Sequence, residues 1–392
     1  MSVRELPLVG LRVLDLSRLL PGPYASLVLA DLGATVDKVE DPQGGDYLRQ
    51  MPPHLGDESA LFYALNRNKR SLSLDLRRPE AQAALRRLVR SYDVLIESFR
   101  PGVMDKLGIG WEALSKEHPR LIYCAISGYG QTGPDRLRAG HDLNYIARAG
   151  VLGYGGPADG PPAMPGVQIA DIGGGSLFAL VGILAALHER QRTGKGRLVD
   201  ISMTEGALAF LHLHLGARLA LGSDGSPLRR GAETLNGGLP CYGVYRTRDG
   251  RYLSVASLEP KFFQGFCEAI GRPDLVVDGY DPGEKGLRAR AEIEAIIGAQ
   301  TLEHWLSVFR DVDLCVEPVL EGDEVLRDPQ LEARGMFVRA VDPQRDREVT
   351  HLRTPLHFGE LPTAPPPALG QHGREILSEA GFSDAEISAL LG

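Results

Sequence analysis

A regular alternation of short apolar runs and helical patterns in the N-terminal part constrains the fold of this chain most strongly. Runs rich in β-branched and other apolar residues are typical of buried strands, and segments with apolar residues at helical spacing separate them. The expected strands cover 11–17, 35–40, 70–76, 93–99 and 121–130, and the expected helices cover 23–34, 79–92 and 111–118. Parallel strands need long crossover connections, which are usually helices. The sequence therefore predicts an α/β fold with a mostly parallel, Rossmann-like sheet and helices on both of its faces.

The character of the sequence changes near residue 225. The stretch 242–259 has two β-rich arms around Asp249 and Gly250, and this dipeptide is a strong hairpin signal. Further helices are expected near 260–271, 287–299 and 301–310. We therefore expect a smaller α+β domain here, followed by a proline-rich linker and a short C-terminal helix pair.

Composition and charge exclude several classes of function. The chain has 392 residues and a net charge of −8, which argues against nonspecific binding to nucleic acid. Its four cysteines are scattered and form no CxxC pair, so neither a disulfide framework nor a zinc site is expected. The N terminus lacks a signal-peptide pattern, and the most apolar run, LFALVGILAAL, is shorter than the ~20 residues of a membrane span. We expect a cytoplasmic protein with no membrane segment and no metal.

A Rossmann-like sheet often binds a nucleotide cofactor, but this sequence lacks the motifs that such binding needs. The turn after the first strand reads SRLLPGPYAS, without the GxGxxG that brings a backbone close to a pyrophosphate. No lysine loop of the P-loop type is present either. Dinucleotide-binding and P-loop functions are therefore not expected.

Two short stretches carry residues that are able to move protons. His141 stands in AGHDLNY, and Asp171 stands in ADIGGG directly before an apolar helical run. Asp171 is either an ordinary helix N-cap or a functional carboxylate, because three successive glycines would let another molecule approach the helix start. His141 is either a loop residue or a proton carrier. The residues alone leave both alternatives open.

Ordered motifs along nearly the whole chain connect these stretches. They are GLRVLDLSRLLPGPYASLVLADLGATVDKVE, NRNKRSLSLDL, VLIESFRPGVMDKLGIG, GYGQTGP, AGHDLNY, ADIGGG, RTGKGRLVDISM and DEVLRDPQLEARGMF. With them the chain resembles the family III CoA-transferases, the CaiB/BaiF family, and within it the α-methylacyl-CoA racemases. The resemblance implies an interlocked homodimer whose large domain is built from 1–224 and 331–392, with a small domain at 225–330. It also implies an active site where domains of two subunits meet.

The resemblance further implies which residues act. The implied catalytic residues are His141, Asp171, Glu259 and Tyr242. The implied CoA contacts are Lys38, Leu72, Arg100, Lys106, Asp142 and Tyr145. The N–H groups of Gly173 and Gly174 are candidates for stabilising an enolate oxygen. Glu259 is expected to orient His141 by accepting its second N–H.

Two activities remain possible under this resemblance, besides CoA binding without catalysis. A racemase would exchange the α-proton of a 2-methylacyl-CoA thioester between His141 and Asp171 through an enolate. A CoA-transferase would use Asp171 as a nucleophile and pass through an aspartyl-CoA thioester. The transferases generally lack a histidine at this position, so His141 favours the racemase. Neither needs a prosthetic group, because CoA enters as part of the acyl-CoA substrate. The sequence carries no readable code for the acyl chain.

Overall fold

The chain divides into two compact units in a computed structural model that describes residues 5–343 and 346–392. Unit 1 contains Met1–Ala149, Val167–Phe210 and Pro329–Gly392, and unit 2 contains Gly150–Gly166 and Leu211–Asp328. Helix α10 (His212–Ala220) belongs to unit 2, where the ring of His214 lies 5.0 Å from that of Tyr154. The expected domain boundaries at 224 and 330 stay predictions.

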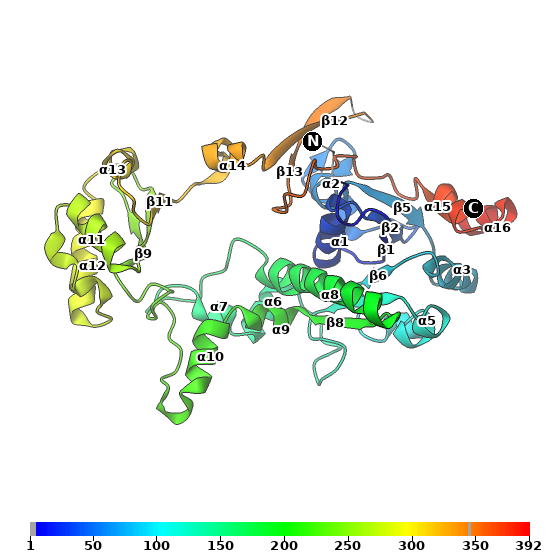
Figure 1. Cartoon of the computed structure of the whole chain (residues 1–392), viewed down its shortest axis with the longest axis horizontal. Helices are drawn as coiled ribbons and strands as arrows, with labels where there is room; N and C mark the ends of the chain where they lie inside the picture. The colour runs from blue at the N-terminus through cyan, green and yellow to red at the C-terminus, as the bar shows by residue number, and fades with distance from the viewer. Residues whose placement is uncertain (1–4, 344–345) are drawn as a thin grey trace. The chain divides into compact units, whose positions relative to one another are not determined.

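Unit 1 is built on a six-stranded sheet in which all neighbouring strands are parallel. Its strands, in spatial order, are β5 (Lys69–Ser73), β2 (Thr35–Glu40), β1 (Arg12–Asp15), β6 (Val94–Glu97), β7 (Ile122–Ser127) and β8 (Leu198–Ser202). In chain order this is 3-2-1-4-5-6, which is the doubly wound arrangement of Rossmann-like folds. The predicted central parallel sheet is therefore confirmed (Figure 1).

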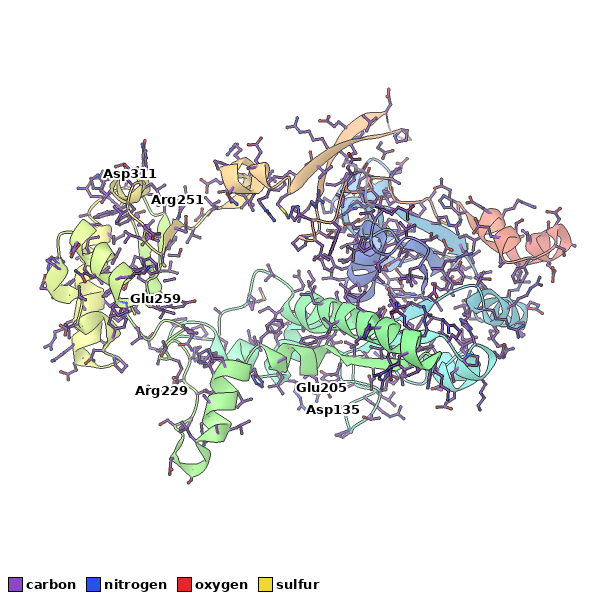
Figure 2. All side chains as sticks on the ribbon, viewed as in Figure 1. Asp135, Glu205, Arg229, Arg251, Glu259 and Asp311 are labelled. Atoms are coloured by element: carbon purple, nitrogen blue, oxygen red, sulfur yellow. The ribbon has the colours of Figure 1, made fainter. Side chains whose placement is uncertain are left out.

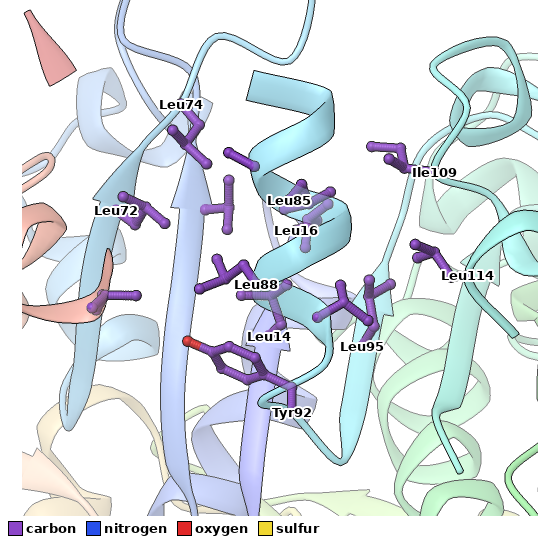
Figure 3. Close-up of a cluster of buried hydrophobic side chains, with 14 of the residues drawn as sticks. Leu14, Leu16, Leu72, Leu74, Leu85, Leu88, Tyr92, Leu95, Ile109 and Leu114 are labelled. Atoms are coloured by element: carbon purple, nitrogen blue, oxygen red, sulfur yellow. The ribbon is translucent and has the colours of Figure 1, made fainter. Parts of the chain in front are cut away.

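Helices cover both faces of this sheet. On one face, Leu14, Leu72 and Leu95 pack with α3 (Pro79–Val89), α5 (Trp111–Glu117) and the C-terminal helices α15 (Gly373–Glu379) and α16 (Asp384–Leu391) (Figure 3). Helix α1 (Pro21–Asp31) contacts β1, β2 and β6, helix α8 (Phe178–Thr193) contacts β7 and β8, and the two helices contact each other. Strands β6 and β7 are buried at every residue, as expected for a sheet covered on both sides.

The C-terminal segment returns to unit 1 after unit 2 is complete. The guanidinium of Arg70 on β5 binds Asp37 with N–O distances of 2.6 and 2.9 Å, and it also binds Glu375 and Glu379 of α15. A two-stranded hairpin, β12 (Phe337–Asp342) and β13 (Arg347–Leu352), precedes this helix pair. The polar network fixes where the last two helices join the sheet.

Unit 2 has its own sheet and core. The hairpin predicted at Asp249 and Gly250 is present as β9 (Tyr242–Arg246) and β10 (Tyr252–Ala256), and β11 (Val316–Pro318) pairs with β10. Three helices pack their aromatic and aliphatic faces together: α11 (Pro260–Ala269), α12 (Glu284–Ile297) and α13 (Leu302–Phe309). The expected small α+β unit is therefore present.

The most apolar run belongs to a longer helix than the sequence suggested. A π-helical segment η2 (Ile169–Leu177) leads directly into α8, so one helix extends over 25 residues from Ile169 to Thr193. By length and composition alone it could cross a membrane, although half of its most apolar window is buried within this chain. Such a helix is weak support for a membrane segment, since the core helix of a globular protein has the same properties. The expected cytoplasmic location stays a prediction.

Candidate active site

A cavity of about 630 Å³ opens at the carboxyl ends of the strands in unit 1. Its walls include the turns that follow β1 and β6, the two central strands at which the chain order reverses. In open α/β sheets, ligands bind at this switch point. The lining residues are Arg18, Leu19, Pro21, Tyr47, Ser98, Phe99, Arg100, Pro101, Ile126, Ser127, Gly128, Arg136, Arg138, Ala139, Gly140, His141, Asn144, Tyr145, Asp171 and Met203.

The first turn of the fold differs from that of dinucleotide-binding enzymes. In those enzymes the start of the first helix offers free N–H groups to a pyrophosphate. Here α1 begins PGP, so Pro21 and Pro23 have no N–H to offer. The Arg18 N–H donates to Ser98 Oγ at 3.1 Å instead, which ties the turn after β1 to the turn after β6. This geometry agrees with the absence of a dinucleotide motif from the sequence.

Asp171 lies on the π-helical segment η2 and faces the cavity. It is not the N-cap of that segment. Asp142, the first residue of α6 (Asp142–Arg148), performs the capping from outside: its Oδ1 accepts the N–H groups of Ala170 at 2.7 Å and Asp171 at 2.9 Å. Burial and the nearby Asp142 carboxylate raise the pKa of Asp171 to about 7. The group is therefore able to hold or release a proton near neutral pH.

The glycines after Asp171 have a packing role that corrects the sequence interpretation. A Cβ on Gly174 would lie 2.7 Å from Met203 O and Ala207 N of α9 (Met203–Ala209), and a Cβ on Gly206 would lie even closer to Gly174 O. Close approach of two helix backbones explains Gly174 and Gly206, whereas a Cβ on Gly173 would meet the ring of Phe210. Neither Gly173 nor Gly174 lines the cavity, so the expectation that their N–H groups stabilise an enolate oxygen is not supported.

His141 lines the same cavity as Asp171. It is the N-cap residue of α6, and its N–H donates to the side-chain oxygen of Asn144 at 3.0 Å. Its side chain is exposed to solvent in unit 1. Beneath it, the hydroxyl of Tyr145 donates to Gly140 O, and burial raises the pKa of Tyr145 to about 12. The structure thus brings together the histidine and the aspartate that the sequence singled out.

Arginines make the cavity wall cationic. Arg18, Arg100, Arg136 and Arg138 all line it, whereas Asp171 is the only carboxylate among the lining residues. Arg18 stacks on the rings of Tyr47 and Phe99, with its Cζ 5.3 and 5.2 Å from their centroids. Only Arg100 of these was expected from the sequence. The position of Arg18 directly after a central strand is the signal that would have found it.

Two of the expected CoA contacts have buried side chains in the structure. Lys38 is fully buried in β2, where its Nζ donates to Ser17 O at 2.7 Å and forms an ion pair with Asp46 Oδ2 at 3.0 Å. Leu72 is fully buried in the core below α15. Neither side chain is exposed to solvent in unit 1, and the expected contacts of these two residues with CoA stay predictions.

The other expected contacts lie nearer to open space. Arg100 and Tyr145 line the main cavity, and Asp142 lies behind Asp171 as described. Lys106 is exposed at the end of α4 (Val103–Lys106), next to Leu107. Leu107 and Val103 line a second cavity of about 250 Å³, which shares Arg18 and Phe99 with the first.

Glu259 and Tyr242 belong to unit 2. Glu259 is exposed at the start of α11 (Figure 2). Tyr242 is the first residue of β9. Tyr242 pairs with Ala256 at the end of β10, and Glu259 follows Ala256 by three residues. Tyr242 and Glu259 therefore come from the same end of the unit 2 sheet. Their roles stay a prediction.

Comparisons with known proteins give the broader setting of this site. The family model of CoA-transferase family III matches residues 8–373. The chain is 38% identical over 387 residues to human alpha-methylacyl-CoA racemase, covering 98% of this chain and 96% of the racemase. It is 37% identical over 340 residues to acetyl-CoA:oxalate CoA-transferase of Acetobacter aceti, covering 85% and 86% of the two chains. A solved CAIB/BAIF family protein from Brucella suis has a TM-score of 0.82 at 34% identity, covering 96% of this chain and 100% of that one.

Proposed function

We propose a racemase activity for this chain, which belongs to CoA-transferase family III. The proposed reaction interconverts (2R)- and (2S)-2-methylacyl-CoA thioesters. The observation that carries the proposal is the presence of His141 and Asp171 in one cavity, together with the pKa of about 7 for Asp171. The sequence identities to a racemase and to a transferase are similar, so they do not decide between the two reactions, and the proposal rests on the chemistry of this site.

The protonation of Asp171 favours proton exchange over nucleophilic attack. A racemase needs an acid and a base on opposite faces of the α-carbon, and each group must work in both protonation states. The carboxyl group of Asp171, with a pKa of about 7, meets this need at neutral pH, and His141 is the second proton carrier of the cavity. A nucleophilic carboxylate, by contrast, must be ionised, and burial beside Asp142 works against ionisation.

The proposed steps use only these two side chains and the thioester. One of the pair removes the α-proton while the thioester carbonyl takes up the charge as an enolate, and the other returns a proton to the opposite face. No metal or prosthetic group takes part in the proposed chemistry.

The arginines of the cavity supply a reason for CoA to bind there. CoA carries a pyrophosphate and a ribose phosphate, and Arg fits phosphate oxygens with two parallel hydrogen bonds. We place the thioester beside His141 and Asp171, and the phosphates near Arg18 and Arg100 of the same cavity.

The resemblance adds a second subunit to the proposal. In the interlocked homodimer expected for the family, we propose that Glu259 accepts the second N–H of His141 and that Tyr242 completes the site. Light scattering during gel filtration tests the dimer. Glu259→Gln should shift the pH–rate profile, because a neutral amide stabilises the imidazolium less than a carboxylate does. An unchanged profile would remove Glu259 from the site.

The second candidate is CoA transfer between carboxylic acids, with a thioester forming at Asp171. The similarity to acetyl-CoA:oxalate CoA-transferase is the observation in its favour. One experiment separates the two. The enzyme is incubated in deuterated water with a 2-methylacyl-CoA, with and without acceptor acids, and hydroxylamine is added during turnover. Washout of the α-hydrogen without any acceptor, and an unmodified Asp171 by mass spectrometry, support the racemase. Acceptor-dependent transfer with an adduct on Asp171 and no washout would establish the transferase.

A further inference from the structure

A buried ion pair lies directly behind the cavity wall that Arg18 and Leu19 form. Lys38 and Asp46 have fully buried side chains, and their Nζ and Oδ2 atoms are 3.0 Å apart. Neither side chain lines the cavity. Burying two charges carries a large desolvation penalty, and a buried pair is weak support for stability by itself. The hydrogen bonds of this pair indicate what else it does.

Both members of the pair hold the backbone of the turn after β1. Lys38 Nζ donates to Ser17 O at 2.7 Å, and Asp46 Oδ1 accepts the N–H of Leu19 at 3.0 Å. Between these two contacts, Leu19 has a φ of +62°. This left-handed conformation is unfavourable for leucine, and it persists only where its surroundings fix it. The ion pair supplies that fixation on both sides of Arg18.

Asp46 also holds the second segment of the same wall. It is the N-cap of the 3-10 turn η1 (Tyr47–Gln50), where its Oδ1 accepts the N–H of Leu48 at 3.1 Å. Tyr47 from this turn accepts a hydrogen bond of 3.2 Å from Arg18 Nη1. One carboxylate therefore sets the positions of Leu19 and Tyr47, and through them the guanidinium of Arg18.

We propose that Lys38 and Asp46 are positioning residues that hold the Arg18–Leu19–Tyr47 wall in the conformation that binds the CoA portion of the substrate. This inference rests on the proposed binding of CoA in the cavity, and it is the same for a racemase and a transferase. Lys38 thus acts on the ligand from behind the wall rather than by direct contact.

The expected effect follows from the population of the binding conformation. If the wall adopts it in only about a tenth of the molecules after Asp46→Ala, the apparent Kd for CoA rises about tenfold. The turn should depend less on Asp46 once residue 19 is glycine, since glycine adopts positive φ readily. Asp46→Ala should therefore weaken binding about tenfold with Leu19 present, but only about two- to threefold in a Leu19→Gly background. A purely structural role predicts equal effects in both backgrounds.

A second buried ion pair in unit 1 provides the matched control. Asp31 pairs with Arg67 at the other end of α1, and both side chains are almost fully buried. Asp31→Ala should lower the thermal stability at least as much as Asp46→Ala, and it should leave the Kd for CoA unchanged. Loss of CoA affinity in both variants would mean that any damage to the fold weakens binding, and it would overturn the positioning role.

The experiment is calorimetric titration of the full chain with free CoA for the four proteins of the cycle and for Asp31→Ala. If Asp46→Ala does not fold, the double replacement Lys38→Met with Asp46→Ala takes its place in the cycle, since it removes both charges of the pair together with the side-chain oxygen that accepts the Leu19 N–H. Additive effects in the cycle would refute the positioning role while leaving the proposed function intact. No binding of CoA by the wild-type protein would instead refute the placement of CoA on which both proposals rest.

Discussion

Replacing Asp171 with asparagine should stabilise the protein at pH 8 and should have little effect near pH 4. Burial and the Asp142 carboxylate raise the pKa of Asp171 from an ordinary value of 3.8 to about 7. The folded protein therefore holds this proton at pH values at which the unfolded chain has already released it. The resulting destabilisation begins as the pH rises above about 4 and is complete above about 7.

The size of this effect follows from the pKa difference. Each pKa unit corresponds to about 1.36 kcal/mol, so a rise of about 3 sets an upper limit of about 4 kcal/mol. The carboxyl group is only partly buried, and we expect water to reduce the effect to about 1–3 kcal/mol. The asparagine side chain of the variant carries no charge at any pH, and the two proteins should converge once Asp171 is protonated.

Urea unfolding of wild type and Asp171→Asn at pH 5 and pH 8, at one protein concentration, measures this difference. The gain from the substitution should be clearly larger at pH 8 than at pH 5. Asp311→Asn, at an exposed position of unit 2, serves as the control and should show no such increase. An equal gain for Asp171→Asn at both pH values would refute the burial of an uncompensated charge at this position.

Three further predictions concern the neighbours of this residue. Gly174→Ala should lower the free energy of unfolding by about 2–4 kcal/mol or prevent folding, because its Cβ would lie 2.7 Å from the α9 backbone. Thermal unfolding measures this, with Gly153→Ala as the control, whose Cβ would meet no atom within 4 Å. Asp142→Asn should lower the pKa of Asp171 and so move the acidic limb of the pH profile of kcat/KM to lower pH. If kinetics measured over a pH series show this limb at the same pH as in wild type, the electrostatic coupling of Asp142 to Asp171 is contradicted. Arg100→Ala should raise KM for the acyl-CoA about tenfold with little change in kcat, and steady-state kinetics that show the reverse would place Arg100 in the chemical step.

The layout of the sheet was predictable because each strand is indicated by the composition of its own short segment of sequence. Residues 93–99 and 121–130 contain short apolar runs, and both contain strands of the sheet. Alternation of strands and helices then leaves few topologies. His141 and Asp171 also met in one cavity, as the resemblance of their motifs to those of a known family implied.

Other features depend on contacts between segments far apart in the sequence. A lysine in a strand such as 35–40 is ordinarily solvated, and only the loop that brings Asp46 above β2 explains why Lys38 is buried. The sequence interpretation is that the glycines after Asp171 let a ligand approach. In the structure the backbone of Gly174 instead lies close to that of Gly206, which is more than thirty positions later in the sequence. The place of α10 in unit 2 likewise depends on the contact of Tyr154 with His214.

The most direct test of two-sided proton exchange is hydrogen washout measured separately for each enantiomer. Pure (2R)- and (2S)-2-methylacyl-CoA are incubated in deuterated water with wild type, His141→Ala and Asp171→Asn, without acceptor acids, and α-deuterium is followed by NMR. If the two residues serve opposite faces, wild type exchanges both enantiomers. Each variant should exchange only one, and the two variants should retain opposite ones. Loss of the same enantiomer in both variants, or no washout with wild type, would contradict the mechanism.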